Sequence, residues 1–249
     1  MQDYLPRPDL LSDRIILVTG AAEGIGRAVA RACARYGATV ILSGADEARL
    51  EAVYDDIEAD GAPQPASLPL DLEQADEQLY LGVASTIGDE FGRLDGLVHC
   101  ATYIPFLSRI DDYDAKEWER VLRINLTAPF LLTQACMPLL RAADDASVVF
   151  TSDRVGRKGL AYWGAYASAA FGIEGLMQTL AEETRGSSDI RVNSLDPGKV
   201  RSAQRRQLYP GEDPNTLPTP DAVVPDYLWL LGPESKGTTG QAVTVSQAH

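Results

Sequence analysis

Short apolar runs alternate with longer segments of helical periodicity along nearly the whole chain. The apolar runs predict buried parallel strands at residues 15–19, 39–42, 66–70, 96–101, 147–151, 190–195 and 243–245. Between them, apolar residues recur at helical spacing and predict helices at residues 24–36, 46–58, 73–91, 118–140 and 161–185. Such alternation requires right-handed crossovers, so we expect an α/β fold with one doubly wound parallel sheet of about seven strands and helices on both faces.

No composition break or linker divides the chain, so we expect a single domain over residues 1–249. The one long irregular stretch is residues 201–225, which is polar and rich in proline. Long irregular segments in a compact domain usually cover a site. We expect this segment, together with the loop at residues 103–113, to decide which substrate is bound.

The charge and hydropathy of the chain argue against two classes of partner. It carries 22 Lys and Arg against 36 Asp and Glu, for a formal net charge of −14. Phosphate backbones and anionic lipid surfaces both attract cationic proteins, so we expect neither nucleic acid nor membrane as a partner. No apolar run approaches the roughly 18 residues of a membrane span, and the N-terminal residues do not resemble a signal peptide.

Cysteine and histidine are scarce, which limits the chemistry that the chain can perform. Cys33, Cys100 and Cys136 lack the spacing of a metal or redox pair, so we expect reduced thiols and a cytoplasmic location. The two histidines, His99 and His249, leave little material for a zinc site or a Ser-His-Asp triad, and we expect no metal. Because His99 and Cys100 are consecutive in a predicted strand, they point to opposite faces and cannot form a nucleophilic pair.

A glycine-rich turn follows the first predicted strand and opens the first predicted helix, in the order Thr19-Gly20-Ala21-Ala22-Glu23-Gly24-Ile25-Gly26. Gly20 would allow a tight turn, Gly24 would let the backbone approach a pyrophosphate, and Gly26 would let helix and strand pack closely. The strand-turn-helix context is the one that this motif requires. The sequence therefore predicts a dinucleotide site, with a tight turn that binds nothing as the alternative.

This spacing resembles that of the short-chain dehydrogenase/reductase family, and the resemblance extends over essentially the whole chain. Within the family, the segments at residues 13–20, 163–167 and 227–230 are most similar to the bacterial YciK group of oxidoreductases. The resemblance implies catalytic roles for Tyr166 and Asn125 and a dinucleotide cleft. It implies cofactor contacts from Thr19, Gly20, Gly24, Ile25, Gly26, Asp71, Leu72, Ala101, Pro197, Gly198, Val200 and Ser202.

Two positions depart from the family's catalytic pattern, which has a Lys four residues after the Tyr and a Ser thirteen residues before it. The first of these positions is Ala170, and the second is Asp153, with Ser152 one residue too early. A phenol with a pKa of about 10 needs a nearby cation to work near neutral pH. Ala170 removes that cation, and an ionised Asp153 would raise the pKa of Tyr166 further.

Asp153 has two interpretations that the sequence leaves open. A desolvated Asp153 could stay protonated and donate a hydrogen bond to a substrate carbonyl in place of the Ser. It could equally be a surface or capping carboxylate. Lys158 lies close in sequence, but a solvated loop lysine is the simpler interpretation.

The cofactor pocket shows two further departures from the family pattern. Thr102 stands where the family has a Gly that allows close approach of the cofactor. After the second strand, Ser43-Gly44-Ala45 offers neither an acid for a ribose diol nor an Arg for a 2′-phosphate, and we expect Asp46 to cap the next helix. Since Glu23 would repel an extra phosphate, the cofactor is NAD or NADP with a slight preference for NAD.

Three functions remain compatible with the sequence. The first is a catalytically impaired family member that acts as a structural or regulatory subunit, as a homo-dimer or tetramer or paired with an active relative. The second is a weak carbonyl reductase or alcohol dehydrogenase that acts on a small substrate with Tyr166 and a protonated Asp153. The third is a dinucleotide-binding sensor without chemistry.

Overall fold

Seven parallel strands form one sheet in the computed structural model, which describes residues 4–245. The strand order is β3-β2-β1-β4-β5-β6-β7. The strands are β1 (Ile15–Thr19), β2 (Thr39–Gly44), β3 (Ala66–Pro69), β4 (Gly96–His99), β5 (Ala146–Thr151), β6 (Ile190–Asp196) and β7 (Ala242–Thr244). The predicted α/β fold with one parallel sheet is confirmed. His249 lies outside the described residues.

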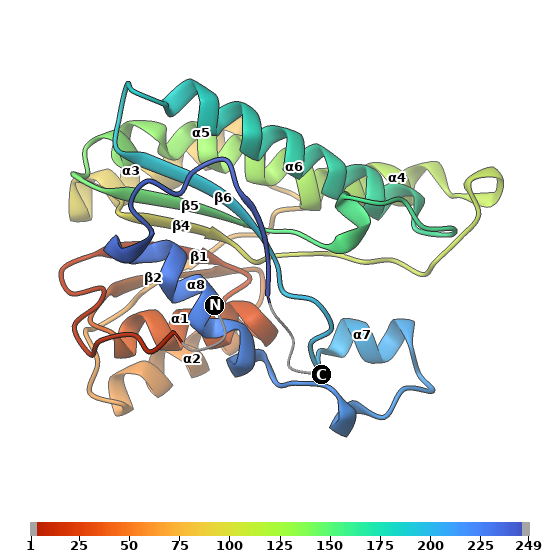
Figure 1. Ribbon diagram of the computed structural model, residues 1–249, viewed down its shortest axis with the longest axis horizontal. Coiled ribbons are helices and arrows are strands. Elements are labelled where there is room, and N and C mark those ends of the chain that lie inside the picture. Colours follow the sequence, from red (N-terminus) through yellow and green to blue (C-terminus); the bar gives the residue numbers. More distant parts are fainter. Residues whose placement is uncertain (1–3, 246–249) are drawn as a thin grey trace.

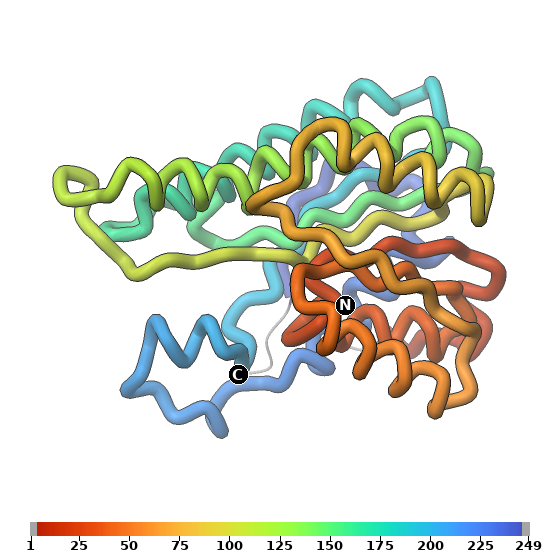
Figure 2. Tube along the Cα trace, turned by 180° about the vertical axis from the view of Figure 1, so that it is seen from behind, coloured from red at the N-terminus to blue at the C-terminus, as the bar shows by residue number. Residues whose placement is uncertain are grey.

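Helices cover both faces of the sheet (Figures 1 and 2). One layer holds α1 (Gly24–Arg35), α2 (Glu47–Ala59) and α8 (Val224–Leu231), and the other holds α3 (Glu77–Phe91), α4 (Ala115–Leu122), α5 (Ala128–Arg141) and α6 (Gly164–Thr184). Two apolar cores result, one on each side of the sheet. The central strands are buried on both faces, which explains their continuous apolar sequences.

The strand order reverses between β1 and β4, and this position fixes where a ligand can bind. In the parallel register Thr19 pairs with Ser43 of β2 and with His99 of β4, so the carboxyl ends of the three strands lie level. In open α/β sheets the crevice outside the carboxyl ends at such a reversal is the usual binding site.

The predicted helix at residues 118–140 is wrong as a single α-helix. The chain forms α4, then a π-helical turn at Arg123–Thr127, then α5. Inside that turn the Asn125 side-chain amide donates to the Val121 carbonyl oxygen at 3.0 Å. A wide turn of this kind is frequent at functional sites and carries one residue out of the regular helical register.

Two further boundaries differ from the sequence-based expectation. The helix expected from residue 73 begins at Glu77, because the Asp76 carboxylate caps it by accepting from the Leu79 amide at 2.9 Å. The segment at residues 201–225, expected to be irregular, contains a short helix α7 (Ala203–Leu208) that the Ser202 side chain caps. Figures 1 and 2 show α7 standing apart from both helical layers.

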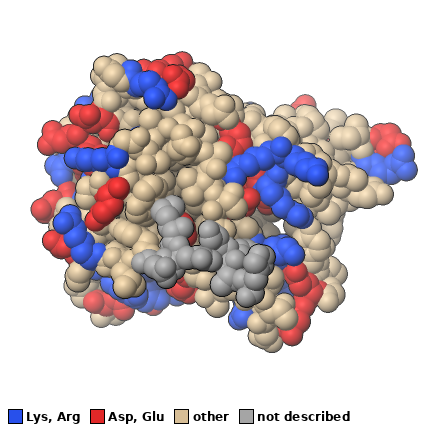
Figure 3. Space-filling model, in the orientation of Figure 1, with Lys and Arg blue, Asp and Glu red and all other residues tan. Residues whose placement is uncertain are grey.

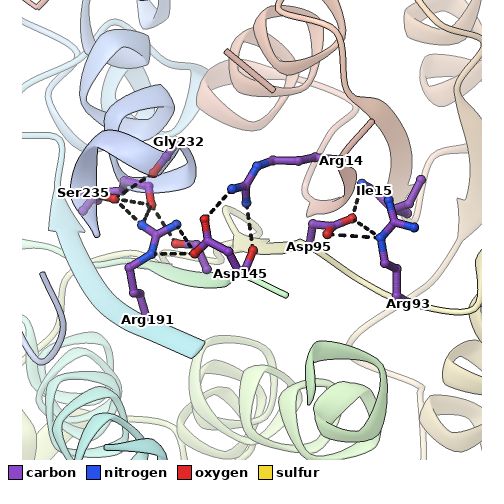
Figure 4. Close-up of polar contacts among 10 residues, drawn as sticks. Arg14, Ile15, Arg93, Asp95, Asp145, Arg191, Gly232 and Ser235 are labelled. Atoms are coloured by element: carbon purple, nitrogen blue, oxygen red, sulfur yellow. Dashed lines mark hydrogen bonds and ion pairs between the residues drawn. The ribbon is translucent and has the colours of Figure 1, made fainter. Parts of the chain in front are cut away.

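A polar network closes the amino ends of the strands, on the edge of the sheet opposite the crevice (Figure 4). Asp145 pairs with Arg14 at 2.5 Å and with the buried Arg191 at 3.1 Å. Arg191 also donates to the Leu230 carbonyl oxygen and to Ser235, which ties α8 and the turn after it to the sheet. Every member of this network has a partner within the fold, so we assign it a structural role.

Acidic and basic side chains are interspersed on the face shown in Figure 3, so the negative charge does not gather into one patch there. Cys33, Cys100 and Cys136 are all buried and unpaired, which agrees with the expectation of reduced thiols. Between residues 4 and 245, no helix has both the length and the apolar character needed to cross a membrane.

Candidate active site

A cavity of about 600 Å³ opens outside the carboxyl ends of the strands, at the reversal of strand order. The twelve residues for which the resemblance implies cofactor contacts all line it. Six come from the glycine turn and the end of β3, namely Thr19, Gly20, Gly24, Ile25, Gly26 and Asp71. The other six are Leu72, Ala101, Pro197, Gly198, Val200 and Ser202. The structure thus brings together residues that lie far apart in the sequence.

The three glycines of the turn have different surroundings. A Cβ on Gly20 would lie 2.8 Å from the Ala101 Cα, and a Cβ on Gly26 would lie 2.2 Å from the Gly20 carbonyl oxygen. A Cβ on Gly24 would meet no atom within 4 Å, although the residue has a φ of +56°. Gly20 and Gly26 therefore serve close packing, whereas Gly24 leaves open space at the amino end of α1. This open backbone beside a helix N-terminus fits the pyrophosphate of a dinucleotide.

Thr19 connects β1 to the wall of the cavity formed after β4. Its hydroxyl accepts from the backbone amides of Cys100 and Ala101, each at 3.2 Å. This fixes Ala101 against the glycine turn, opposite Gly20. The wall is therefore held by hydrogen bonds within the protein, from two backbone amides to the Thr19 side chain.

Charged side chains line the cavity beyond the end of β2, where the sequence offered no obvious recognition group. Asp46 caps α2 as expected, accepting from the Arg49 amide at 3.1 Å. Arg49 reaches back to the turn and pairs with Glu23 at 2.6 Å and with Asp46 at 3.1 Å. A cation held between two carboxylates thus stands where the adenine ribose of a dinucleotide binds in such folds. No pattern in the sequence marked Arg49 as part of the site.

Tyr166 lies in the first turn of α6 and faces the same cavity. Its ring packs against Trp163, with the ring centroids 5.7 Å apart. Burial raises the pKa of Tyr166 well above its ordinary value, and the Asp153 and Asp196 carboxylates raise that pKa further. The Thr102 hydroxyl acts in the opposite direction by hydrogen bonding. The phenol is therefore held in its neutral form.

Asp153 is a capping carboxylate and also lies in the cavity, whereas its protonated, donating role stays a prediction. Its carboxylate accepts from the Val155 amide at 2.9 Å and so caps a 3-10 turn, and it also lines the cavity with Tyr166. Burial raises the pKa of Asp153, against the smaller effects of the Val155 hydrogen bond and the Arg154 and Arg205 charges.

The Ser152 hydroxyl is engaged by a buried carboxylate. It is buried and donates to the Glu174 carboxylate at 2.6 Å. The same carboxylate accepts from Ser194 of β6 at 2.7 Å and from the Arg157 guanidinium at 3.3 Å. Arg157 in turn donates to the Val243 carbonyl oxygen of β7 at 2.9 Å. Glu174, which no sequence pattern marked, thus joins α6 to the end of β5 and to β6 directly, and to β7 through Arg157.

A small void of about 20 Å³ lies beside Ala170, on the face of α6 that carries Tyr166. Tyr166, Asn125, Thr102 and Ser152 line it, and no Lys or Arg does. Ala170 is nearly buried, and a Cβ on Gly156 would lie 2.9 Å from it.

Lys158 is exposed and lines neither this void nor the larger cavity, so the simpler interpretation of a solvated loop lysine holds.

Asn125 sits in the π-helical turn with all of its side-chain hydrogen-bonding capacity used locally. Its amide nitrogen donates to the carbonyl oxygens of Val121 and Tyr103, at 3.0 and 2.7 Å. Its amide oxygen accepts from the Tyr103 amide at 2.8 Å and from the Thr102 hydroxyl at 2.9 Å. These contacts make Asn125 an anchor for the loop after β4.

Thr102, which stands where the family has a Gly, lines the cavity and turns its side-chain hydroxyl toward Asn125. Its carbonyl oxygen accepts from the Gln204 side chain of α7 at 2.7 Å. Arg205, next to Gln204, pairs with Glu212 at 2.6 Å and lies over the Tyr209 ring. The short helix α7 therefore lines the cavity, so the segment at residues 201–225 covers the site as expected, although part of it is helical.

His99 and Cys100 are both buried, as expected for packing residues. The His99 ring stacks on Phe150 and shares a hydrogen bond with Thr133 at 2.9 Å. Burial lowers the pKa of His99 to about 3, so its ring stays neutral. The Cys100 thiol contacts the Thr151 hydroxyl at 3.3 Å, and burial raises its pKa to about 11. Neither group is poised for chemistry.

Comparison with known proteins identifies this arrangement. The model of the short chain dehydrogenase family matches residues 14–213. The chain is 45% identical to the oxidoreductase YciK of Escherichia coli K12 over 237 residues, which cover 95% of this chain and 93% of that protein.

Two solved structures are also similar over nearly their whole length. A short chain dehydrogenase structure from Pseudomonas syringae has a TM-score of 0.96 and 48% identity, covering 98% of this chain and 99% of that one. A second, from Shigella flexneri 2a and complexed with NADP, has a TM-score of 0.93 and 44% identity, covering 96% and 99%. This chain therefore belongs to the short-chain dehydrogenase/reductase family of NAD(P)-dependent oxidoreductases.

Proposed function

We propose that this protein keeps the dinucleotide cleft of its family but is impaired in carbonyl and alcohol chemistry, and that it acts as a structural or regulatory subunit. One observation carries the proposal. Ala170 lies four residues after Tyr166 on the same helix face, beside a void that no cationic side chain lines. Where the family pattern has a lysine, the void beside Ala170 is lined by no Lys or Arg.

The missing charge matters because of the proton that Tyr166 would have to move. A bound nicotinamide supplies or accepts a hydride, and the Tyr166 hydroxyl would donate or take the accompanying proton. A cation a few ångströms away lowers the pKa of an acid by about 1 to 3 units. Each unit is worth about 1.4 kcal/mol, so its loss slows a phenolate-dependent step by about 10- to 1,000-fold. Burial and the Asp153 carboxylate act in the same unfavourable direction.

A weak carbonyl reductase or alcohol dehydrogenase is the alternative, and the environment of Asp153 favours it over a mere sensor. Burial raises the pKa of this carboxyl, which lines the cavity with Tyr166. In its protonated form Asp153 would donate a hydrogen bond to a substrate carbonyl oxygen. Activity of this kind would be highest at low pH and would fall as pH rises through the pKa of Asp153.

For the cofactor we propose a slight preference for NAD over NADP. Glu23 and Asp46 flank Arg49 at the place of the adenine ribose, and their two charges exceed its one. Carboxylates accept hydrogen bonds from ribose hydroxyls and repel a 2′-phosphate. The preference is small because Arg49 also offers a cation, and the similar Shigella flexneri chain was solved with NADP.

The subunit role requires a surface for assembly, and we propose the outer faces of α5 and α6. Phe130 of α5 and Phe171 of α6 are 42% and 47% exposed. Exposed aromatic side chains of this size favour association. Copurification from native extract would identify an active relative as partner, whereas self-association alone would count against a hetero-oligomer.

Calorimetric titration with NAD, NADH, NADP and NADPH, followed by a screen of alcohols and carbonyl compounds, tests the function. We expect saturable binding of at least one nucleotide pair and little or no turnover. Rapid turnover of any neutral carbonyl compound would refute the impairment. Absence of binding even at high nucleotide concentration would refute the cleft itself, and with it both the sensor and the enzyme alternatives.

A further inference from the structure

Two carboxylates act on Tyr166 from neighbouring strand ends, and one of them, Asp153, lines the cavity together with it. Asp153 follows β5, and Asp196 is the last residue of β6. Each is anchored by one backbone amide, with Asp153 accepting from Val155 at 2.9 Å and Asp196 accepting from Gly198 at 2.8 Å. Both act electrostatically on the Tyr166 phenol. The reacting end of the cleft thus has an acid, Asp153, at the family's serine position and the uncharged Ala170 at its lysine position, with Asp196 acting on Tyr166 from behind the cavity wall.

The cations nearest to these acids are paired elsewhere or exposed. Arg157 pairs with Glu174 at 3.3 Å, and Arg205 pairs with Glu212 at 2.6 Å. Arg154 is exposed and has no ion pair within the described part of the chain. Arg205 lines the cavity with its charge paired to Glu212, and neither Lys nor Arg lines the void beside Ala170, in contrast to a site with a lysine at that position.

We propose that this site suits a cationic iminium substrate, the protonated C=N group of an imine, rather than a neutral carbonyl compound. The proposal rests on the dinucleotide cleft of the proposed function and names the substrate class of that same site. A carbonyl group needs an acid to protonate its oxygen as hydride arrives, and the missing lysine weakens that acid. An iminium group brings its own positive charge and its own proton.

The step balances without a proton relay. The iminium carbon accepts a hydride from the reduced nicotinamide, a C–H bond forms, and the C=N π pair becomes the lone pair of a neutral amine. The imine is reduced and the nicotinamide is oxidised. Tyr166 need only hydrogen bond in its neutral form, which its burial favours.

Asp153 would act by holding the imine in its protonated form. An adjacent carboxylate raises the pKa of a bound imine and so increases the reactive fraction near neutral pH. An ionised Asp153 serves the iminium, whereas a protonated Asp153 would serve a carbonyl group. The two substrate classes therefore predict opposite pH profiles, with iminium turnover lost as pH falls through the pKa of Asp153.

The test uses the full chain with NADH and NADPH and two probes of similar shape, 3,4-dihydroisoquinoline and the neutral ketone 1-tetralone. Consumption of reduced nicotinamide is followed with each probe. We expect the imine to react at least about tenfold faster than the ketone, one pKa unit of advantage being a factor of ten. Asp153→Asn, whose amide oxygen can keep the Val155 hydrogen bond, should remove this advantage, and Ala170→Lys should reverse it.

A binding measurement separates this proposal from a fault in the cleft. Calorimetry should show that the amine product, tetrahydroisoquinolinium, binds the protein–nucleotide complex more tightly than 1-tetralol, and Asp153→Asn should abolish the difference. Equal affinities, or an inert imine despite intact nucleotide binding, would overturn the iminium proposal alone. Failure of the nucleotide to bind would overturn the proposed function and this inference together.

Discussion

Replacing Glu174 by Ala should destabilise the fold by several kilocalories per mole. The Glu174 carboxylate is buried and accepts three hydrogen bonds, from Ser152, Ser194 and Arg157. Hydrogen bonds to charged groups contribute about 1.5 to 3 kcal/mol each. The variant regains part of this free energy, because Arg157 keeps its hydrogen bonds to β7 and its guanidinium reaches solvent. Breaking a buried ion pair costs about 3 to 5 kcal/mol, and we expect a loss in this range.

Urea denaturation and thermal melting would measure the loss. For a chain of this size, about 1 kcal/mol lowers the Tm by about 2 to 4 °C, so the expected decrease is about 6 to 20 °C. Glu174→Gln should cost less, since its amide oxygen still accepts hydrogen bonds. Glu182→Ala on the same helix is the matched control, because its pair with Arg185 is exposed and contributes little. If Glu174→Ala were as stable as the control, the joining role of this carboxylate would be refuted.

Two other changes give distinct outcomes. The raised pKa of Asp153 means that its charged form is disfavoured in the folded state, so its contribution to stability is lost as pH rises above the unfolded pKa. Asp153→Asn should therefore raise the Tm at pH 7 to 8 and change it less near pH 4, and equal gains at both pH values would contradict this. Gly24→Ala should weaken nucleotide binding more than it destabilises the fold. Gly26→Ala should chiefly destabilise the fold, because its Cβ meets the Gly20 carbonyl oxygen. Calorimetry measures the binding and thermal melting the stability, and the reversed pattern would contradict the assigned roles.

Features encoded by contiguous residues could be predicted from the sequence. Apolar runs predicted the positions of all seven strands, and the signal was clearest for the central strands, because a strand buried on both faces needs side chains of one kind. The glycine turn predicted the crevice, since Gly20 and Gly26 are required by the backbone itself. Asp46 as a helix cap followed from its own position before α2.

Features that depend on residues distant in sequence could not be predicted in the same way. The role of Glu174 requires hydroxyl groups from two strands and a guanidinium from a loop. The place of Arg49 in the site depends on its ion pair with Glu23, which lies 26 residues earlier in the chain. The π-helical turn around Asn125 depends on contacts with the loop after β4. Ser202 was the one local signal for α7, since serine is a favoured helix cap.

The central claim is that the cleft binds dinucleotide while the lack of a cation beside Tyr166 impairs carbonyl chemistry. The most direct test compares the wild type with the Asp153→Ser, Ala170→Lys double variant, and uses Ala170→Met as a control of similar length without charge. We expect equal nucleotide affinity and at least about a hundredfold faster carbonyl turnover in the double variant alone, as two pKa units imply. Equal turnover in the wild type and the double variant, with nucleotide bound to both, would contradict the account.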